Sequence, residues 1–414
     1  MNLRTLFSST YLTWNTLAAH YQTPGVKITD ESNKWIRKTA PIVNVAKKAL
    51  LIVAFAITTI ATGLFSLFIL PYRIYQLKNA NQLVAADLAL LTSNQRAELR
   101  LQIVNCIREK EKKHNFRLTS EQYEEFLRDI IAYYARSSEF YGPVALAWTE
   151  YLLEKANKDN RKLVFCARDG IAPYEIALKL MQRPDYQQKY PNLVGEEKIV
   201  LAYLSRAVVT ESNRTAENKE TFHKYLNQLG IRDGDQCTFV DIGFQGSQIN
   251  NTRSILKFNN HNIDASFSYL LSHTDDAEGF IISEDDSRRT EQEAFKQLPS
   301  IMSILYKRAG SNLATHWLED THQKNVKSPS RLVKVEENGK IKVYPNTLVP
   351  GAKEFVASKG SKEYFIRKWC IKAVVQGAEK YDIAALNLSL AVNRLDEMLD
   401  KVVKGQLPLL VSHR

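Results

Sequence analysis

The stretches FCARDG (residues 165–170) and FVDIGFQGS (residues 239–247) each join a short apolar run to a polar turn that contains glycine. Apolar runs of this length that end at a glycine turn are typical of buried strands. A third apolar run ends at YLSR, residues 203–206. In α/β enzymes, the turns after parallel strands present backbone N–H groups and carboxylates to phosphorylated ligands. We therefore expect an α/β domain that binds a phosphorylated ligand.

Four apolar runs follow one another from residue 163, with helix-like segments between them. This alternation predicts an α/β fold, a doubly wound and mainly parallel sheet with helices on both faces, within residues 159–350. Asn338-Gly339 between two further apolar runs indicates a β-hairpin, and residues 291–308 are predicted to be helical. The four predicted strands are LVFCA (163–167), KIVLAY (198–203), CTFVDI (237–242) and ASFSYLL (265–271).

Helical flanks are predicted on both sides of this domain. Residues 77–158 are a helical connector, in which Thr92-Ser93-Asn94 opens one helix and the capping-box spacing Thr119-Ser120-Glu121-Gln122 opens another. Residues 351–414 are predicted to form a helical tail. Residues 1–48 are an N-terminal segment in which we find no chemical motif.

Residues 49–70 are 22 consecutive positions without a charged side chain. A helix of this length spans about 30 Å of hydrocarbon, so the segment is predicted to cross a membrane. A buried core helix is the alternative, and Gly63 also permits a re-entrant hairpin. More lysine and arginine residues precede the run than follow it, which favours a cytosolic N-terminus.

Composition limits the classes of function. The chain has 414 residues, of which 44% are hydrophobic, so it is long enough to bury a large core. Its net charge of +11 is spread along the sequence without a block of like charges, so nucleic-acid binding is not expected. A basic surface suits phosphorylated substrates or an anionic membrane. The four cysteines lack the spacing of a metal site or a disulfide framework, which indicates a reducing compartment.

A phosphoribosyl donor requires hydrogen-bond donors for its 5-phosphate, a carboxylate for its ribose hydroxyls and positive charge for its pyrophosphate. Gly243 and Gly246 allow backbone N–H groups to approach a phosphate, and Asp241 can face the sugar. Arg168 and Arg206 can pair with the pyrophosphate oxygens, together with Mg²⁺. The alternatives are that Asp241 caps the following helix and that Arg206 is a solvated surface charge.

The order of these motifs resembles a known family. Its members are phosphoribosyltransferase-like modules of bacterial capsule and surface-glycan proteins, often labelled predicted hydrolases of the haloacid-dehalogenase superfamily. The resemblance covers roughly residues 140–345. It implies a phosphoribosyltransferase-like or Rossmann-like fold and a transferase of glycan biosynthesis, with ARDG as the pyrophosphate loop and DIGxxGS as the donor-binding loop. The matching motifs are Tyr141-Gly142-Pro143, FCARDG, YLSR, FVDIGFQGS and Trp317-Leu318-Glu319.

Two departures from the family pattern bear on activity. Asp241 is followed by Ile242, whereas the usual donor loop is longer and has paired acidic residues. A haloacid-dehalogenase-like hydrolase requires a nucleophilic Asp where this chain has Ala167. We expect a membrane-associated, phosphoribosyl-type glycosyltransferase. The alternatives are a catalytically inactive, membrane-anchored protein that binds a phosphate ligand, such as a secreted effector, and a haloacid-dehalogenase-like hydrolase.

The candidate site combines residues from these motifs. Glu319 matches the family pattern and is expected to orient the acceptor, while His316, Glu319 and His322 have a helical spacing that suits either a metal or a solvated face. The expected partners are a phosphorylated sugar donor and a membrane, with residues 80–414 in the cytosol, where such donors occur. Candidate catalytic residues are Asp241, Asp169 and Glu319, with Asp169 on Mg²⁺; candidate substrate-binding residues are Arg168, Gly170, Ser205, Arg206, Gly243, Phe244, Gln245, Gly246 and Ser247.

Overall fold

The computed structural model divides the chain into two compact units, residues 1–79 and residues 80–414. In the first unit, residues 42–53 are helical. The rest of the predicted membrane segment, residues 54–70, lies outside the described residues. Among the helices that the structure describes, none is both long enough and apolar enough to span a membrane. The described residues are 42–53, 85–167, 169–244, 246, 248–272, 274–283, 296–298, 329–334, 340–345 and 361–403.

The second unit contains a six-stranded sheet with the strand order β2-β1-β3-β4-β5-β6. Every neighbouring pair in this sheet is parallel. The predicted α/β fold with a mainly parallel sheet is therefore confirmed, and the four predicted strands coincide with the first four observed. The strands are β1 Lys162–Cys166, β2 Ile199–Ala202, β3 Gln236–Phe244, β4 Asp264–Ser272, β5 Glu278–Ser283 and β6 Lys296–Leu298.

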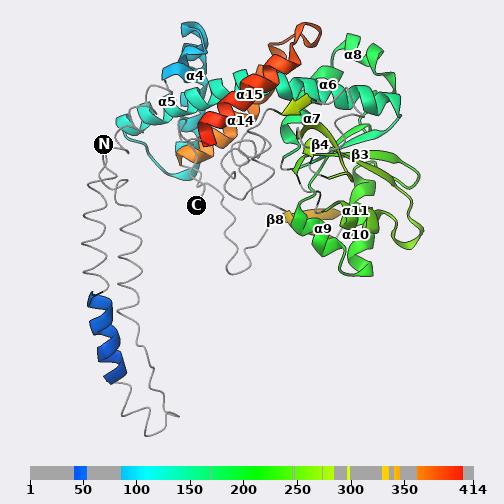
Figure 1. Ribbon diagram of the computed structural model, residues 1–414, viewed down its shortest axis with the longest axis horizontal. Helices are drawn as coiled ribbons and strands as arrows, with labels where there is room; N and C mark the ends of the chain where they lie inside the picture. The colour runs from blue at the N-terminus through cyan, green and yellow to red at the C-terminus, as the bar shows by residue number, and fades with distance from the viewer. Residues whose placement is uncertain are drawn as a thin grey trace. The chain divides into compact units, whose positions relative to one another are not determined.

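Helices cover both faces of the sheet because side chains alternate along each strand. Leu163 and Phe165 of β1 belong to the core cluster that contains α7, whereas Val164 belongs to the cluster that contains α9, α10 and α11. Figure 1 shows α6 and α7 on one side of the sheet and α9, α10 and α11 on the other. The connecting elements are α7 Ile171–Met181, α8 Pro184–Lys189, η2 Pro191–Leu193, α9 Arg206–Ser212, α10 Ala216–Gln228, α11 Ile249–Leu256 and η3 Phe258–Asn260.

A helical layer packs on the α7 face of the sheet. Both predicted helix starts are confirmed, because Thr92 and Thr119 each form a capping box with the glutamine three residues later. Helix α14 contacts α5, α6, α7 and η1, so the connector and the tail share one core with the sheet. The elements are α4 Ser93–His114, α5 Ser120–Arg136, η1 Ser137–Tyr141, α6 Gly142–Lys158, α14 Lys362–Glu379, η6 Ile383–Ala385 and α15 Leu388–Val403.

Two predictions concern the segment after β5. The helix predicted over residues 291–308 is wrong at Lys296–Leu298, which form β6 beside β5. Pairing with an existing strand supplies backbone hydrogen bonds that outweigh a local helical preference. The predicted hairpin is confirmed as the antiparallel strands β7 Pro329–Lys334 and β8 Ile341–Pro345. The side chain of Gln228 on α10 accepts from the Ile341 N–H and donates to its carbonyl, which fixes β8 to this helix.

Backbones approach closely where α14 crosses the start of α6. A Cβ atom added at Gly377 would lie 2.4 Å from the Ser138 carbonyl oxygen, and one added at Gly142 would lie 2.9 Å from the Gly377 carbonyl carbon. Distances this short require backbone movement. The two glycines therefore set the separation of α14 from η1 and α6.

We expect Gly377→Ala to lower the free energy of unfolding by about 1–3 kcal/mol, the usual cost of overpacking. Helix propensity alone predicts that the substitution raises the free energy of unfolding, since alanine is favoured over glycine by about 1 kcal/mol in a helix interior. Denaturant titration of the full chain measures the difference. The matched control is Glu379→Ala at the exposed end of the same helix, which should change stability by less than about 0.5 kcal/mol. A stabilised Gly377→Ala protein would contradict the close-packing interpretation.

Candidate functional site

The site lies at the point where the winding of the sheet reverses. β1 and β3 are neighbours, with Phe165 opposite Val240, but the chain leaves them on different faces. After β1 it enters α7 on one face, and after β3 it enters α11 on the other. In the strand order 2-1-3-4-5, the crevice outside the carboxyl ends of β1 and β3 is the usual ligand position. Both predicted motifs, FCARDG and FVDIGFQGS, end at this edge.

The turn after β1 is tight. The Ala167 N–H donates to the Ala202 carbonyl at 2.8 Å, and the Gly170 N–H donates to the Cys166 carbonyl at 2.7 Å. A Cβ atom at Gly170 would lie 2.8 Å from both the nitrogen and the oxygen of Cys166, so the turn excludes any larger residue. Gly170 also precedes the first turn of α7. Asp169 is thereby held beside the end of β1, while Arg168 lies outside the described residues.

The last residues of β3 and the loop that follows it need glycine for their backbone geometry. Gly243 has φ +97° and Gly246 has φ +65°, values that other residues rarely adopt. A Cβ atom at Gly243 would also lie 2.4 Å from the Leu271 carbonyl oxygen. The loop leads into α11, which begins at Ile249. Gln245 and Ser247 lie outside the described residues, and only the backbone of Phe244 is described.

Asp241 lies near residues of the two neighbouring strands, β1 and β4. Its Oδ1 accepts the Ile242 N–H at 2.8 Å, and Tyr269 of β4 is its partner in the sheet register. Burial raises the pKa of Cys166, and the carboxylates of Asp241 and Asp169 raise it further. Burial, followed by Asp241 and Cys166, likewise raises the pKa of Tyr269. The structure therefore brings the two predicted acids, Asp169 and Asp241, close to one thiol.

These surroundings limit the chemistry that the cluster can perform. A thiol beside two carboxylates stays protonated at neutral pH, which makes Cys166 unsuitable as a nucleophile. Carboxylate oxygens are the protein ligands that Mg²⁺ accepts, usually one or two of them together with substrate phosphates. Asp169 and Asp241 fit this ligand type. The arrangement can hold a cation and sugar hydroxyls at the sheet edge.

The third predicted motif follows β2 at the same edge. The Ser205 hydroxyl accepts the Val208 N–H at 3.2 Å, so this side chain caps α9. Arg206 is exposed at the first position of α9 and forms no ion pair with a carboxylate of the described residues. The roles of both residues in ligand binding stay predictions. Glu319, His316 and His322 lie outside the described residues.

Sequence reasoning missed Tyr269 as a neighbour of Asp241. The sequence contains part of the information needed to find it, because side chains alternate along a strand and every second residue lies on the same face. Phe267 and Tyr269 of β4 share the face of Phe239 on β3. The register that sets Tyr269 opposite Asp241 depends on how β3 and β4 pair, and no short motif encodes that pairing.

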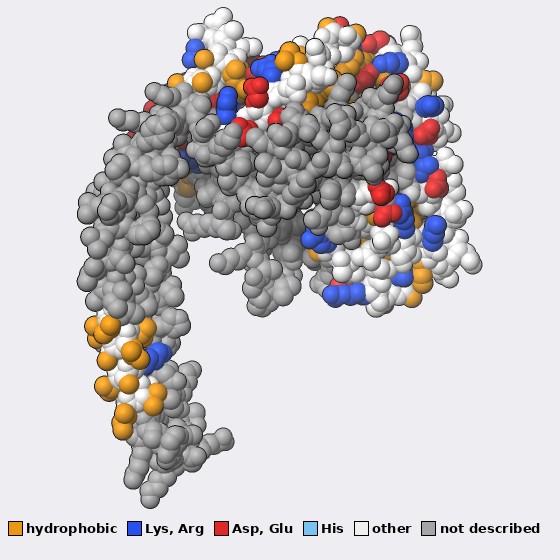
Figure 2. All heavy atoms as spheres, viewed as in Figure 1, with side chains coloured by type: hydrophobic (Ala, Val, Ile, Leu, Met, Phe, Trp, Pro, Cys, Tyr) orange, Lys and Arg blue, Asp and Glu red, His pale blue; other side chains and the backbone are white. Residues whose placement is uncertain are grey.

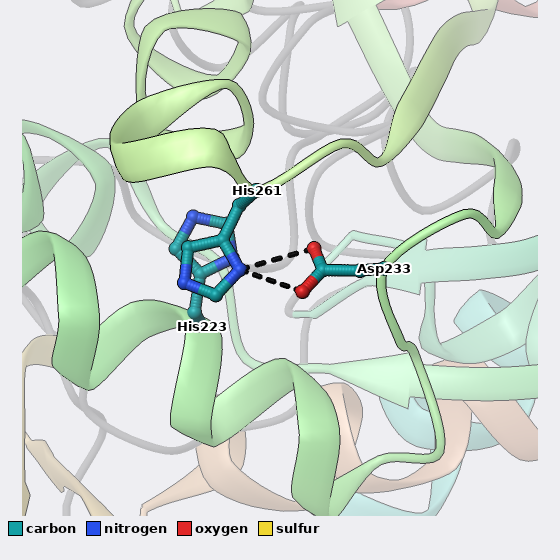
Figure 3. Close-up of side chains that lie close together, drawn as sticks. All are labelled: His223, Asp233 and His261. Carbon is teal, nitrogen blue, oxygen red and sulfur yellow. Dashed lines mark hydrogen bonds and ion pairs between the residues drawn. The ribbon is translucent and has the colours of Figure 1, made fainter.

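A second group of ligand-type side chains lies between α10 and the loops that precede β3 and β4. His223, Asp233 and His261 offer ligand atoms within 4.8 Å of one another. His223 and His261 are stacked, with ring centroids 3.7 Å apart and planes inclined by 15°. His261 Nδ1 faces both Asp233 oxygens, at 2.8 and 3.0 Å (Figure 3).

Stacking opposes metal binding by this pair. A metal ion bound to imidazole lies in the ring plane at about 2.0–2.1 Å from nitrogen, and an ion between two nearly parallel rings lies outside both planes. His223 Nε2 is already 2.7 Å from the Ile255 carbonyl oxygen. The group is better described as a hydrogen-bonded histidine stack, completed by Glu220 at 3.6 Å from His261 Nε2.

The stack predicts a pH dependence of stability. Burial, with a contribution from His261, lowers the pKa of His223 below its usual value of 6.5. A proton therefore binds the unfolded chain more readily than the folded one, so stability is full above pH 6.5 and falls as the pH drops below it. For one titrating group, the free energy of unfolding changes by at most about 1.4 kcal/mol per pH unit. Hydrogen bonds to Asn259 and His261 lower the pKa of Glu220, so this carboxylate stays ionised in the same range.

We expect His223→Gln to flatten this dependence between pH 6.5 and about 5, because glutamine does not titrate and can still donate to Ile255. Denaturant titrations of both proteins at several pH values measure the two slopes. Asp233 stays ionised here as well, because despite burial its hydrogen bonds to His261 and Asn262 lower its pKa. Equal slopes in the wild type and the variant would exclude His223 as the titrating group.

Comparison with known proteins adds no assignment. No protein-family model matches the chain, and no curated protein sequence matches it.

Proposed function

We propose that the chain is a phosphoribosyl-type glycosyltransferase that uses a phosphorylated sugar pyrophosphate as donor. The observation that carries this proposal is the position of Asp169 and Asp241 at the reversal point of the sheet, beside a glycine loop that leads into α11. Strand ends at such a point are where doubly wound folds bind phosphorylated ligands. The sequence resemblance of FCARDG, YLSR and FVDIGFQGS supports the same reaction class.

Each motif has a role in this proposal. Asp241 accepts hydrogen bonds from the ribose hydroxyls, and the backbone of residues 243–247 binds the 5-phosphate through N–H groups that the glycines leave accessible. Arg168 and Arg206 balance the pyrophosphate charge. Asp169 would hold Mg²⁺, which, when bound, neutralises charge on the leaving pyrophosphate. Glu319 orients the acceptor.

The reaction needs positioning and electrostatic stabilisation more than a protein nucleophile. Positive charge develops at the anomeric carbon as pyrophosphate leaves, and a nearby carboxylate stabilises that charge. Asp241 supplies this carboxylate, and the hydrogen bond that Oδ1 accepts from the Ile242 N–H fixes its orientation. A protonated Cys166 is compatible with this reaction, since no covalent intermediate on sulfur is required.

We expect Asp241→Asn to abolish donor turnover and to leave the melting temperature within a few degrees. Asparagine can still accept the Ile242 N–H, but it loses the negative charge that stabilises the sugar. The measurement is release of pyrophosphate from phosphoribosyl pyrophosphate with water as the acceptor, with and without Mg²⁺, together with calorimetric donor binding. Asp185→Asn, an exposed acid on α8, is the matched control. If the wild type binds the donor without turning it over, the chain is a binding protein and not a transferase. If the wild type does not bind the donor, the proposed site is wrong.

We further propose that the protein associates with a membrane through its N-terminal unit and that residues 80–414 lie in the cytosol. The helix of residues 42–53 supports this, because its apolar side chains are exposed (Figure 2). Lys47 and Lys48 on the same helix suit an anionic surface. Exposed apolar area of this kind marks a membrane or protein contact. The exposed apolar residues are Ile42, Val43, Val45, Leu50, Ile52 and Val53.

Protease treatment of sealed vesicles of known orientation tests this location. We expect residues 80–414 to be digested only from the cytosolic face, because the proposed donor is cytosolic. Detergent-permeabilised vesicles are the control for protease access. Digestion from the opposite face alone would contradict both the location and the choice of donor.

A further inference from the structure

A surface cavity of about 370 Å³ lies between α4, α5 and the short helix of residues 85–89. It belongs to the helical layer and shares no residue with the sheet-edge site. Its charged lining consists of Arg96, Arg100, Arg128 and Glu124. Three guanidinium groups around one carboxylate give the lining a formal charge of +2.

The carboxylates near this cavity do not neutralise it. Glu124 pairs with Arg100 at 2.5 Å, and this pairing lowers the pKa of Glu124. Asp129 accepts from Arg128 at 3.0 Å, but it also accepts from Lys362 at 2.7 Å. Lys362 also pairs with Glu125 at 2.9 Å, so Arg128 and Lys362 are balanced by two carboxylates, and the uncompensated positive charge of the lining lies on Arg96.

Arg96 has no carboxylate partner among the described residues. Among the residues that the structure describes, its guanidinium donates only to the Ser93 hydroxyl, at 3.4 Å, on the preceding turn of α4. Arg96 is half-buried, and part of its side chain therefore has little access to water. A guanidinium in this position keeps its charge and most of its donors for a ligand.

Ser93 and three apolar side chains form the rest of the lining. Leu88, Ala97 and Ile131 lie beside the arginines. A small inorganic anion uses the guanidinium groups alone, whereas a ligand with carbon atoms attached to its phosphate also covers these apolar groups. The cavity therefore combines bidentate phosphate recognition with a hydrocarbon contact.

We propose that this cavity binds a phosphate group, through Arg96 and Arg128, and that the preferred source is the phosphomonoester headgroup of an anionic lipid. Free phosphate offers the same oxygens, so both sources share one chemistry at the arginines. Only the lipid adds contacts to Leu88, Ala97 and Ile131. This site goes beyond the proposed transferase activity and does not depend on it.

The test uses the full chain in micelles of an uncharged detergent. Native mass spectrometry of micelles that contain equal amounts of phosphatidic acid and phosphatidylcholine measures lipid preference, and calorimetry with inorganic phosphate measures the free anion. We expect phosphatidic acid to be retained preferentially. The double variant Arg96→Gln, Arg128→Gln should bind about tenfold more weakly or not at all, because each guanidinium contributes a charge-assisted hydrogen bond.

Two control variants distinguish this cavity from binding elsewhere on the protein. Arg183→Gln removes an exposed, ion-paired arginine on another part of the surface and should retain binding. Asp241→Asn changes the sheet-edge site and should also retain binding at the cavity. Any phosphate that binds at the sheet edge should still bind to the double arginine variant. Arginine-dependent binding of inorganic phosphate but not of lipid would support the phosphate site and exclude the lipid source. Binding of neither ligand, or equal binding by the double variant and Arg183→Gln, would overturn the proposal.

Discussion

The parallel pairing of β1 with β3 is the constraint on which the rest of the fold depends. Residues 162–165 of β1 pair with residues 237–240 of β3, although more than seventy residues separate them in sequence. Because α7 covers one face and α11 the other, this pairing is where the winding reverses. It brings two turns from different parts of the chain to one edge, and with them Asp169 and Asp241.

The helical layer depends on a different kind of contact. Gly142 and Gly377 allow backbone atoms to meet where α14 crosses α6. A buried ion pair fixes the chain at the start of the same unit, with Arg136 Nε donating to Asp87 Oδ2 at 3.1 Å. Burial raises the pKa of Asp87 and Arg136 opposes that shift. Loss of either partner would leave a buried charge, so this pair specifies the geometry more than it adds stability.

Charge is distributed differently over the two candidate binding regions. At the sheet edge, burial and then the carboxylates of Asp241 and Asp169 raise the pKa of Cys166, and these two carboxylates suit cations and sugar hydroxyls. In the cavity between α4 and α5, arginines exceed the acids that line it, which suits phosphate. The histidine stack lies at the opposite end of the strands, since Asp233 and His261 precede β3 and β4. Its protonation therefore acts on stability and is separate from the sheet-edge chemistry.

Local sequence determined much of the architecture. Strands β1 to β4 lie where apolar runs of β-type residues occur, and α4 and α5 begin where Thr92 and Thr119 can form capping boxes. Gly243 at the end of β3 and Gly246 in the following loop have positive φ values, which glycine adopts readily. These features are predictable because strand alternation, helix capping and glycine geometry each depend on only a few neighbouring residues.

Contacts between residues far apart in sequence decided the strand order and the arrangement of the candidate binding sites. The strand order, the assembly of β6 within a segment with helical periodicity, and the position of Tyr269 opposite Asp241 depend on which strands pair. The arginines of the α4–α5 cavity are 32 residues apart at Arg96 and Arg128, and neither belongs to a recognisable motif. Sequence patterns specify which face of a helix or strand is apolar. The free energy of packing decides which other element covers that face. The pairing chosen in this way set the positions of the sheet-edge residues relative to one another.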